Sequence, residues 1–286
     1  MEESEYIPLE PGALVYVFAD VQGSRPILDL IQIREMNEKQ SKQMLDRTRS
    51  AAAALYPPES GRRFQLTAWG DYPSFRAGMA FGMSKNWKKR HSATGGLPYW
   101  YSAKDRLSVA LNAKQAFVSA PVNDVPDEPF LRTPGLEAPE GFLEFRRGAL
   151  ISCWLEDPAV LINQIFEKMR LPLQLPAERI FVSLFLAADR PESGVIVTTG
   201  ETGDRQYDAM IRIQVSGATQ ARALVTLFTL ARSFIAAGMV QEDGPAALAA
   251  LLFANPPVQD GRNLNIKIDA LTGKDIALLF SFFPVY

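Results

Sequence analysis

The chain has 286 residues, 47% of them hydrophobic and 22% charged, with a formal net charge of −2. This balance is typical of a soluble globular protein, and without an excess of positive charge we expect no nucleic-acid partner. No run of ~18 or more apolar residues could form a transmembrane helix, and no secretory signal peptide opens the sequence.

The first half of the chain combines one long helical segment with several strand-like runs. Ser24 can cap a helix that has Pro26 in its first turn, and the alanines of "RSAAAALY" extend this helix until Pro57 ends it. Strands are predicted at Ala13–Val21, Arg63–Tyr72 and Phe75–Met83, and in the runs "LPYWYSA", "RLSVALN" and "QAFVSA".

A segment rich in proline and acidic residues, 120–141, reads as a linker to the second half. A helix is predicted to start at Asp157-Pro158 and to end at Pro172, and a longer one covers Ala218–Met239. Two short apolar helical segments follow, "GPAALAALLFA" and "TGKDIALLFSFF". The predicted strands are "GALISCWLE", "RIFVSLFLAA", "GVIVTTGE", "YDAMIRIQVS" and "NLNIKIDAL".

Two of these runs, "YDAMIRIQVS" and "NLNIKIDAL", alternate between apolar and polar side chains, which is typical of antiparallel sheets with one wet face. The sequence therefore predicts an α+β fold, in which a large, mostly antiparallel sheet, in one or more layers, is flanked by amphipathic helices in an α/β/α-like arrangement. We expect a single domain over residues 1–286. The echo of "GALVYVFAD" at Gly12 by "GALISCWLED" at Gly148 also suggests two pseudo-repeat halves, 12–119 and 148–286.

Catalytic and metal-binding signatures are weak. His91 is the only histidine and lies in the polar run "KNWKKRHSATGG", while Cys153 is the only cysteine. One histidine and one cysteine cannot make the familiar zinc sites, and no phosphate-binding loop motif is present. We therefore expect neither an enzyme nor a bound metal or cofactor, although a carboxylate pair for glycoside chemistry stays open.

The stretch "ATQARALVTLFTLARSFIAAGM", Ala218–Met239, contains no acidic residue, and its bulky apolar side chains share one face. Such a helix either packs on a sheet or lies in a membrane interface. The uncharged segment "PAALAALLFANPP" that follows poses the same alternatives and is too short to span a bilayer. The residues expected to contact lipid are Leu224, Leu227, Phe228, Phe234, Leu248, Leu251, Leu252 and Phe253.

Cations and large aromatic side chains alternate in "KNWKKRHSATGGLPYWY", a mixture that suits the headgroup region of a bilayer. The same mixture could stack single-stranded nucleic acid, which the acidic whole disfavours, or form a solvated loop before a half-buried strand. The predicted interfacial residues are Trp87, Lys88, Lys89, Arg90 and Trp100.

These helical stretches, set among many strands, resemble the treponemal outer-membrane-associated lipoprotein family, which has an α/β/α fold and several amphipathic helices. The architecture is also similar to that of mycobacterial lipid-carrier lipoproteins. The resemblance implies a location at the periplasmic face of the outer membrane, insertion of amphipathic helices into lipid, and a hydrophobic cavity. No lipobox or N-terminal acylated cysteine is present, so we expect the lipid anchor to have been removed from this chain or never to have existed.

The expected function is therefore that of a membrane-associating protein of the inner leaflet of the outer membrane. It would bind lipid or another amphiphile, insert amphipathic helices, and carry lipid or permeabilise the membrane. A homodimer formed through an amphipathic helix is a further expectation. The alternative is a soluble periplasmic ligand-binding or protein-interaction module without membrane insertion, and the lone cysteine leaves a cytoplasmic location open.

Overall fold

A computed structural model of the chain describes residues 6–29, 38–91, 98–123, 136–158, 176–187, 205–236, 250 and 253–276. They belong to two compact units: unit 1 comprises residues 1–25 and 33–144, and unit 2 comprises residues 26–32 and 145–286. Two short helices, α1 (Arg25–Leu28) and α4 (Phe142–Phe145), each cross a boundary between the units along the chain.

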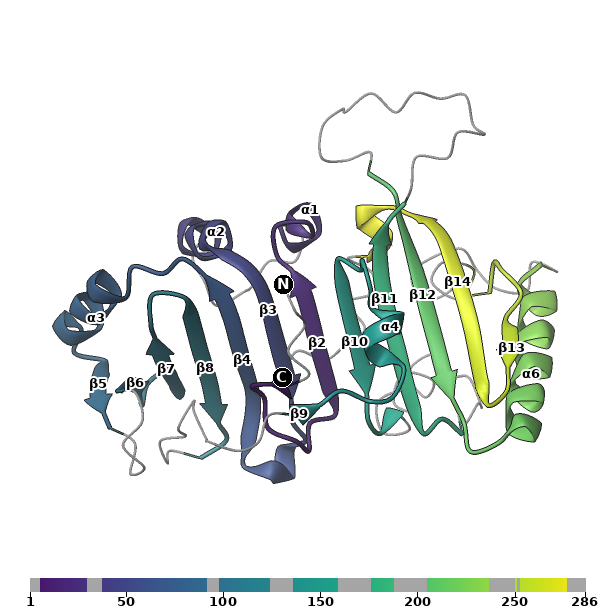
Figure 1. Cartoon of the computed structure of the whole chain (residues 1–286), viewed down its shortest axis with the longest axis horizontal. Helices are drawn as coiled ribbons and strands as arrows, with labels where there is room; N and C mark the ends of the chain where they lie inside the picture. The colour runs from purple at the N-terminus through teal and green to yellow at the C-terminus, as the bar shows by residue number, and fades with distance from the viewer. Residues whose placement is uncertain are drawn as a thin grey trace. The chain divides into compact units, whose positions relative to one another are not determined.

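Unit 1 contains an antiparallel sheet with the strand order β2-β3-β4-β8-β7-β6-β5 (Figure 1). A separate pair, β1 and β9, is also antiparallel. The strands are β1 (Tyr6–Ile7), β2 (Val15–Asp20), β3 (Thr48–Leu55), β4 (Arg62–Gly70), β5 (Trp87–Arg90), β6 (Tyr99–Ser102), β7 (Leu107–Leu111), β8 (Gln115–Pro121) and β9 (Leu136–Glu137), and the helices are α2 (Glu38–Arg47), the 3-10 turn η1 (Pro58–Ser60) and α3 (Ser74–Met83).

The helix predicted from Ser24 to the alanine run is wrong in its second part. Thr48–Leu55 forms the strand β3 between β2 and β4. The register places Ala54 opposite Tyr16 and Ala52 opposite Phe18, and all four side chains are buried. Small residues on β3 leave room for the large aromatic rings of β2 on the same face, so tertiary packing overrides the helical propensity of alanine.

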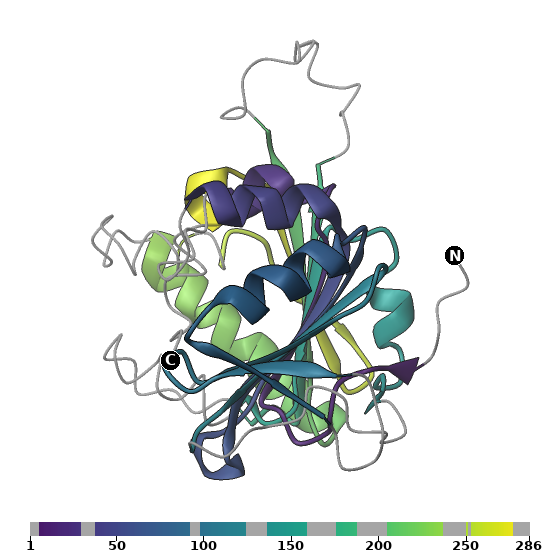
Figure 2. The ribbon, with the colours of Figure 1, turned by 90° about the vertical axis from the view of Figure 1, so that its left-hand side faces the viewer.

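The run Phe75–Met83, predicted as a strand, is also different in the structure, where Ser74–Met83 is the helix α3. α3 contacts β5 at the end of the sheet, which faces the viewer in Figure 2. At the linker 120–141, the strands β8 and β9 occupy part of the predicted connection, and residues 124–135 lie outside the described part of the chain.

Unit 2 contains an antiparallel sheet with the strand order β13-β14-β12-β11-β10. Its elements are β10 (Ile151–Leu155), β11 (Arg179–Leu186), β12 (Tyr207–Gln214), α6 (Ala218–Ala236), β13 (Val258–Asp260) and β14 (Asn263–Leu271). The predicted alternation of "NLNIKID" is confirmed, because Leu264, Ile266 and Ile268 are buried on one face of β14. The predicted strand "GVIVTTGE" and most of the helix predicted after Pro158 lie outside the described residues.

The two units share an order of connections. In each, three successive antiparallel strands are followed by a helix, α3 or α6, and a later strand returns to pair with the third strand, as β8 does with β4 and β14 with β12. In each unit, a Gly-Ala-Leu sequence immediately precedes the first of these three strands. Gly12 and Gly148 have φ of 90° and 78°, and the amides of Leu14 and Leu150 donate to carbonyls of the second strand, each at 2.8 Å. The pseudo-repeat stays a prediction, which these correspondences support.

Candidate lipid-contacting surfaces

Helix α6 uses its inner face to pack on β13 and β14. Ala221 and Leu224 on this face are buried, with 0% and 1% of their surfaces exposed. At the start of the helix, the side-chain amide of Gln259 donates a hydrogen bond of 3.2 Å to the carbonyl of Ala218. The structure therefore places Leu224, one of the predicted lipid contacts, in the core of unit 2.

The outer face of α6 is apolar to an unusual degree for a surface that meets water. Leu227 and Leu230 are 40% and 51% exposed, and the only charges on the helix are Arg222 and Arg232. Ordinary surface helices carry charged and polar residues on the face opposite the core. Leu227 was expected from the sequence, whereas Leu230 was missed because the helical projection placed the bulky residues on a single broad arc.

The hydroxyl groups on this outer face are already bonded within the helix. Thr226, Thr229 and Ser233 each donate to the carbonyl of the residue four positions earlier, at 3.1, 2.8 and 3.0 Å. A polar group costs free energy on transfer to an apolar medium chiefly when it loses its hydrogen bonds. These three side chains therefore add less to the cost of placing α6 in lipid than their polarity suggests.

The ring of Phe228 on α6 contacts that of Phe253, which lies after the helix, with centroids 4.9 Å apart. Both residues are half-buried. This contact joins the helix to the chain segment that follows it. Both residues are predicted lipid contacts, and the sequence did not predict that they touch each other. The remaining predicted contacts, the side chain of Phe234 and all of Leu248, Leu251 and Leu252, lie outside the described residues.

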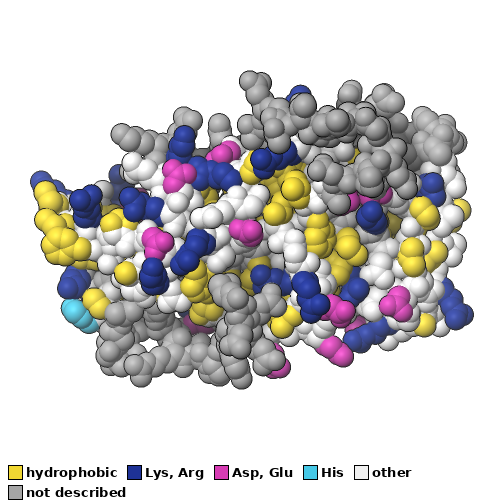
Figure 3. Space-filling view, turned by 45° about the horizontal axis from the view of Figure 1, so that its top comes forward, with side chains coloured by type: hydrophobic (Ala, Val, Ile, Leu, Met, Phe, Trp, Pro, Cys, Tyr) yellow, Lys and Arg dark blue, Asp and Glu magenta, His cyan; other side chains and the backbone are white. Residues whose placement is uncertain are grey.

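A second apolar surface lies on α3 in unit 1. Phe75, Met79 and Met83 are spaced by four residues along one face, and they are 79%, 53% and 84% exposed. Figure 3 shows hydrophobic side chains gathered at this end of the molecule, with Lys and Arg side chains beside them. Sequence reasoning missed this surface because it assigned the run to a strand, although the four-residue spacing of three large apolar side chains was visible.

The opposite side of α3 is held by aromatic packing. The Phe81 ring lies 4.7 Å from that of Trp87 and 5.7 Å from that of Trp100, measured between centroids. A Cβ added at Gly82 would come within 3.4 Å of the Trp100 ring, so the helix lies close to β6 at this point. Both predicted interfacial aromatic residues, Trp87 and Trp100, therefore support the helix that carries the exposed stripe.

The three predicted cations lie on β5, the edge strand next to β6. Lys88, Lys89 and Arg90 are all exposed. Lys89 pairs in register with Trp100, so it lies on the face of the sheet that α3 covers, whereas Lys88 pairs with Tyr101 on the other face. The structure thus brings together all five predicted interfacial residues.

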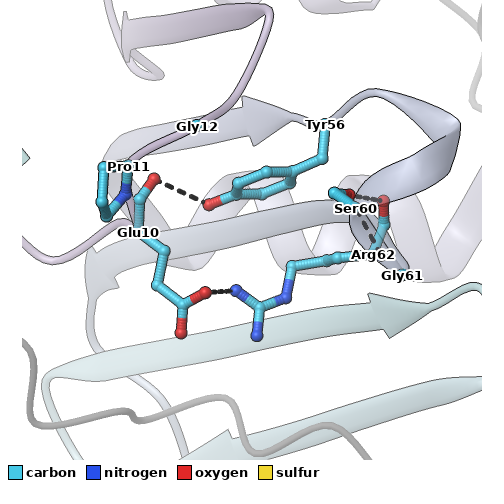
Figure 4. A pocket seen from close by; sticks show the side chains of 7 residues that line it. All are labelled: Glu10, Pro11, Gly12, Tyr56, Ser60, Gly61 and Arg62. Atoms are coloured by element: carbon cyan, nitrogen blue, oxygen red, sulfur yellow. Dashed lines mark hydrogen bonds and ion pairs between the residues drawn. The ribbon is translucent and has the colours of Figure 1, made fainter.

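A small pocket in unit 1 has a different character (Figure 4). It encloses about 270 Å³, lined by Glu10, Pro11, Gly12, Tyr56, Ser60, Gly61 and Arg62. The Tyr56 hydroxyl donates to the carbonyl of Glu10 at 2.9 Å, and Arg62 forms an ion pair with the Glu10 carboxylate. The charged and hydroxyl groups in its lining give this pocket a polar character, so it is not the hydrophobic cavity that the family resemblance implies.

Groups with catalytic potential are scattered in the part of the chain that the structure describes. No cluster of three or more His, Cys, Asp or Glu side chains there could hold a metal ion. His91 is exposed at the end of β5. Cys153 on β10 keeps some accessible surface as a residue, but desolvation raises the pKa of its thiol to about 12, which suppresses the reactive thiolate.

No helix within the described residues is both long and apolar enough to cross a membrane.

Comparisons with known proteins identify relatives of this architecture. A family model described as "Outer membrane-associated lipoprotein TP0453" matches residues 7–123, which confirms the resemblance drawn from the sequence. The matched segment contains α3, β5 and β6. No match is found among curated proteins.

Crystal structures of TP0453 share the fold over nearly the whole chain. Crystal form I is 16% identical with a TM-score of 0.60, covering 99% of this chain and 100% of that one. Form IV is 16% identical with a TM-score of 0.60 and covers 96% and 97%, and form III is 14% identical with a TM-score of 0.59 and covers 96% of each. The predicted α+β fold with a mostly antiparallel sheet and flanking helices is confirmed.

Proposed function

We propose that this protein is a non-enzymatic protein of the periplasmic face of the outer membrane, and that it associates with membrane lipid through α6. The observation that carries the proposal is the outer face of this helix, where Leu227 and Leu230 are exposed beside hydroxyl groups that bond back to the helix. The family match supports the location, because the matched family is described as outer membrane-associated.

The docked helix alone would bind lipid weakly. Burying a leucine completely contributes about 1.5–3 kcal/mol, and Leu227 and Leu230 are each only about half exposed, so together they contribute about 1.5–3 kcal/mol. Stable association therefore requires more apolar surface. Release of α6 from β13 and β14 supplies it, because Leu224 then leaves the sheet, Phe228 leaves Phe253, and both enter the acyl boundary.

Release of α6 from the sheet is favourable only where lipid is present. In water the inner face of α6 loses its contacts with the sheet, whereas at a membrane the acyl chains replace them at a similar free energy per buried area. The membrane thus shifts the population from a docked to a released helix by its differential affinity for the two states. In this proposal, the outer face makes the first contact and the inner face stabilises the inserted state.

Vesicle flotation of the unlipidated chain tests the proposal. We expect the wild-type chain to float, and the variant Leu227→Glu with Leu230→Glu to stay in the dense fraction. The matched control replaces Met44 and Leu186 by Glu, because these side chains are 41% and 54% exposed and lie on α2 and β11. The control should float as the wild type does.

Two results would overturn the proposal. If the wild-type chain does not float with any vesicle, the soluble periplasmic ligand-binding or interaction module is favoured instead. If the α6 variant floats as well as the control, another surface of the protein makes the contact. Urea unfolding of each variant, followed by circular dichroism, establishes that the loss of flotation does not come from unfolding.

A further inference from the structure

Helix α3 has the same place in the connections of unit 1 that α6 has in unit 2. Each helix follows the third strand of an antiparallel trio, β4 or β12, and precedes the strand that returns to pair with it, β8 or β14. Both helices lack acidic residues, and both expose large apolar side chains away from the sheet. Corresponding positions with the same unusual surface suggest the same use.

The exposed stripe of α3 is more pronounced than that of α6. Phe75 and Met83 are 79% and 84% exposed, against 51% for Leu230 on α6. No residue of α3 is buried, yet its orientation is set, because Phe81 packs between the helix and the rings of Trp87 and Trp100. The helix therefore presents its apolar stripe outward from a rigid support, and it needs no rearrangement to offer it.

The surroundings of the stripe are strongly cationic, although the whole chain has a formal net charge of −2. From Tyr72 to Lys104 the sequence contains no Asp or Glu. The same segment contains six Lys and Arg residues, Arg76, Lys85, Lys88, Lys89, Arg90 and Lys104. An apolar stripe near cations matches the layers of a bilayer surface that contains anionic lipid.

We propose that the α3–β5 surface, formed by the apolar stripe of α3 and the cations of β5, is a second lipid-contacting surface that selects anionic lipid. The inference rests on the proposed function and assigns the lipid class. Phe75, Met79 and Met83 enter the acyl boundary. Lys89, on the face of the sheet that α3 covers, and Lys88 and Arg90, on the other face of this edge strand, meet the phosphate groups of the lipid from the two sides of β5. A basic protein or a neutral lipid surface would not satisfy these cations.

Partition between buffer and vesicles measures the selectivity. Vesicles of phosphatidylcholine alone are compared with vesicles that also contain phosphatidylglycerol. Each surface cation contributes about fivefold to binding of an anionic membrane, so replacing Lys88, Lys89 and Arg90 by Gln should weaken binding to phosphatidylglycerol about a hundredfold. Binding to phosphatidylcholine should not change.

The matched charge control replaces Lys42, Arg47 and Arg49 by Gln. These cations are also exposed, but they lie on α2 and the start of β3, away from the apolar stripe in the sequence and the sheet. The control should bind phosphatidylglycerol within about threefold of the wild type. An equal loss in the control and in the β5 variant would overturn the inference, because it would show attraction by net charge alone.

A label on α3 reports the contact itself. An environment-sensitive fluorophore is attached to Met83→Cys, and the pKa of about 12 keeps the thiol of Cys153 from competing for the label. We expect a blue shift with phosphatidylglycerol vesicles, and none for the same label at Met44→Cys on α2. Absence of a shift at Met83→Cys while the protein is bound would overturn the inference.

The tests separate this inference from the proposed function. If Phe75→Gln with Met83→Gln binds both vesicle types as the wild type does, the α3–β5 surface is overturned and α6 alone accounts for binding. If the Leu227→Glu, Leu230→Glu variant binds normally and the α3 variant does not, the proposed role of α6 fails and the inference about α3 stands. If the wild-type chain binds neither vesicle, both are overturned.

Discussion

Replacing Ala221 by leucine should move α6 from the sheet towards lipid. Ala221 is 0% exposed on the inner face of the helix, and neighbouring Leu224 is 1% exposed, so three additional carbon atoms have no space there. Overpacking of a filled core costs about 1–3 kcal/mol, which weakens the docked state. In lipid the same atoms stabilise the helix, at about 0.8 kcal/mol for each carbon.

The two effects act in the same direction. Together they favour the released, lipid-bound helix by about 3–5 kcal/mol, and each 1.4 kcal/mol is a factor of about ten in an equilibrium constant. Vesicle partition should therefore increase about a hundredfold or more. In water the same substitution should lower the free energy of unfolding by about 1–3 kcal/mol.

Ala223→Leu is the matched control, because Ala223 is exposed on the outer face of α6. It adds the same three carbons without disturbing the docked helix, so stability in urea should change by less than about 0.5 kcal/mol. Partition and urea unfolding of both variants give the decisive comparison. If Ala221→Leu loses stability but gains no partition, while Ala223→Leu gains partition, α6 binds lipid without leaving the sheet and the release step is refuted.

Three further predictions concern packing and chemistry. Cys153 should resist a thiol reagent at about pH 8 in the folded protein and react fully in urea, and folding stability should fall above pH 9.0, where the unfolded thiol ionises but burial raises the folded pKa to about 12. Gly78→Ala should raise the free energy of unfolding by about 0.5–1 kcal/mol, since an added Cβ on α3 meets nothing within 4 Å. Gly70→Ala should lower it by more than about 2 kcal/mol in urea unfolding, because its Cβ would lie 2.0 Å from a backbone oxygen. A double-mutant cycle that replaces Phe228 and Phe253 by leucine should give a coupling of about 0.5–1.5 kcal/mol, and a coupling near zero would show that their rings do not pack in solution.

Most strands could be predicted because β-branched and aromatic residues gather in short runs bounded by turn residues, and in β12 and β14 the side chains also alternate. β3 could not be predicted from its own residues, because the reason for its small side chains lies in the strand that pairs with it. Ala52 and Ala54 favour a helix when the segment is considered alone, and only the opposing rings of Phe18 and Tyr16 show why small side chains are required there. This requirement for small side chains cannot be seen in the sequence of β3 alone.

The helix α3 was predicted as a strand for the reverse reason: the pattern within its own sequence indicated the wrong structure. Phe75, Ala77, Met79, Phe81 and Met83 alternate with smaller or charged residues, as in a strand with one apolar face. In a helix the same residues separate into an outward stripe and the inward ring of Phe81. Alternation predicts a buried sheet face only where another layer covers it, and in α3 the apolar side chains remain exposed.

The candidate lipid surface on α6 shows a similar limit. The sequence identified an apolar helix, but a helix that packs on a sheet and also exposes Leu227 has apolar residues on both sides. The helical projection cannot say which side the sheet occupies. Only the packing of Ala221 on its inner face separates Leu224, which supports the fold, from Leu227, which meets solvent.

The cations of β5 also affect whether the edge of the sheet pairs with another molecule. β5 is an edge strand, and an edge strand with unpaired backbone groups is a template for aggregation unless charged side chains discourage pairing. Lys88, Lys89 and Arg90 give β5 this protection in dilute solution. Anionic headgroups that neutralise the same charges would remove it, so self-association through β5 should be sought on vesicles rather than in buffer.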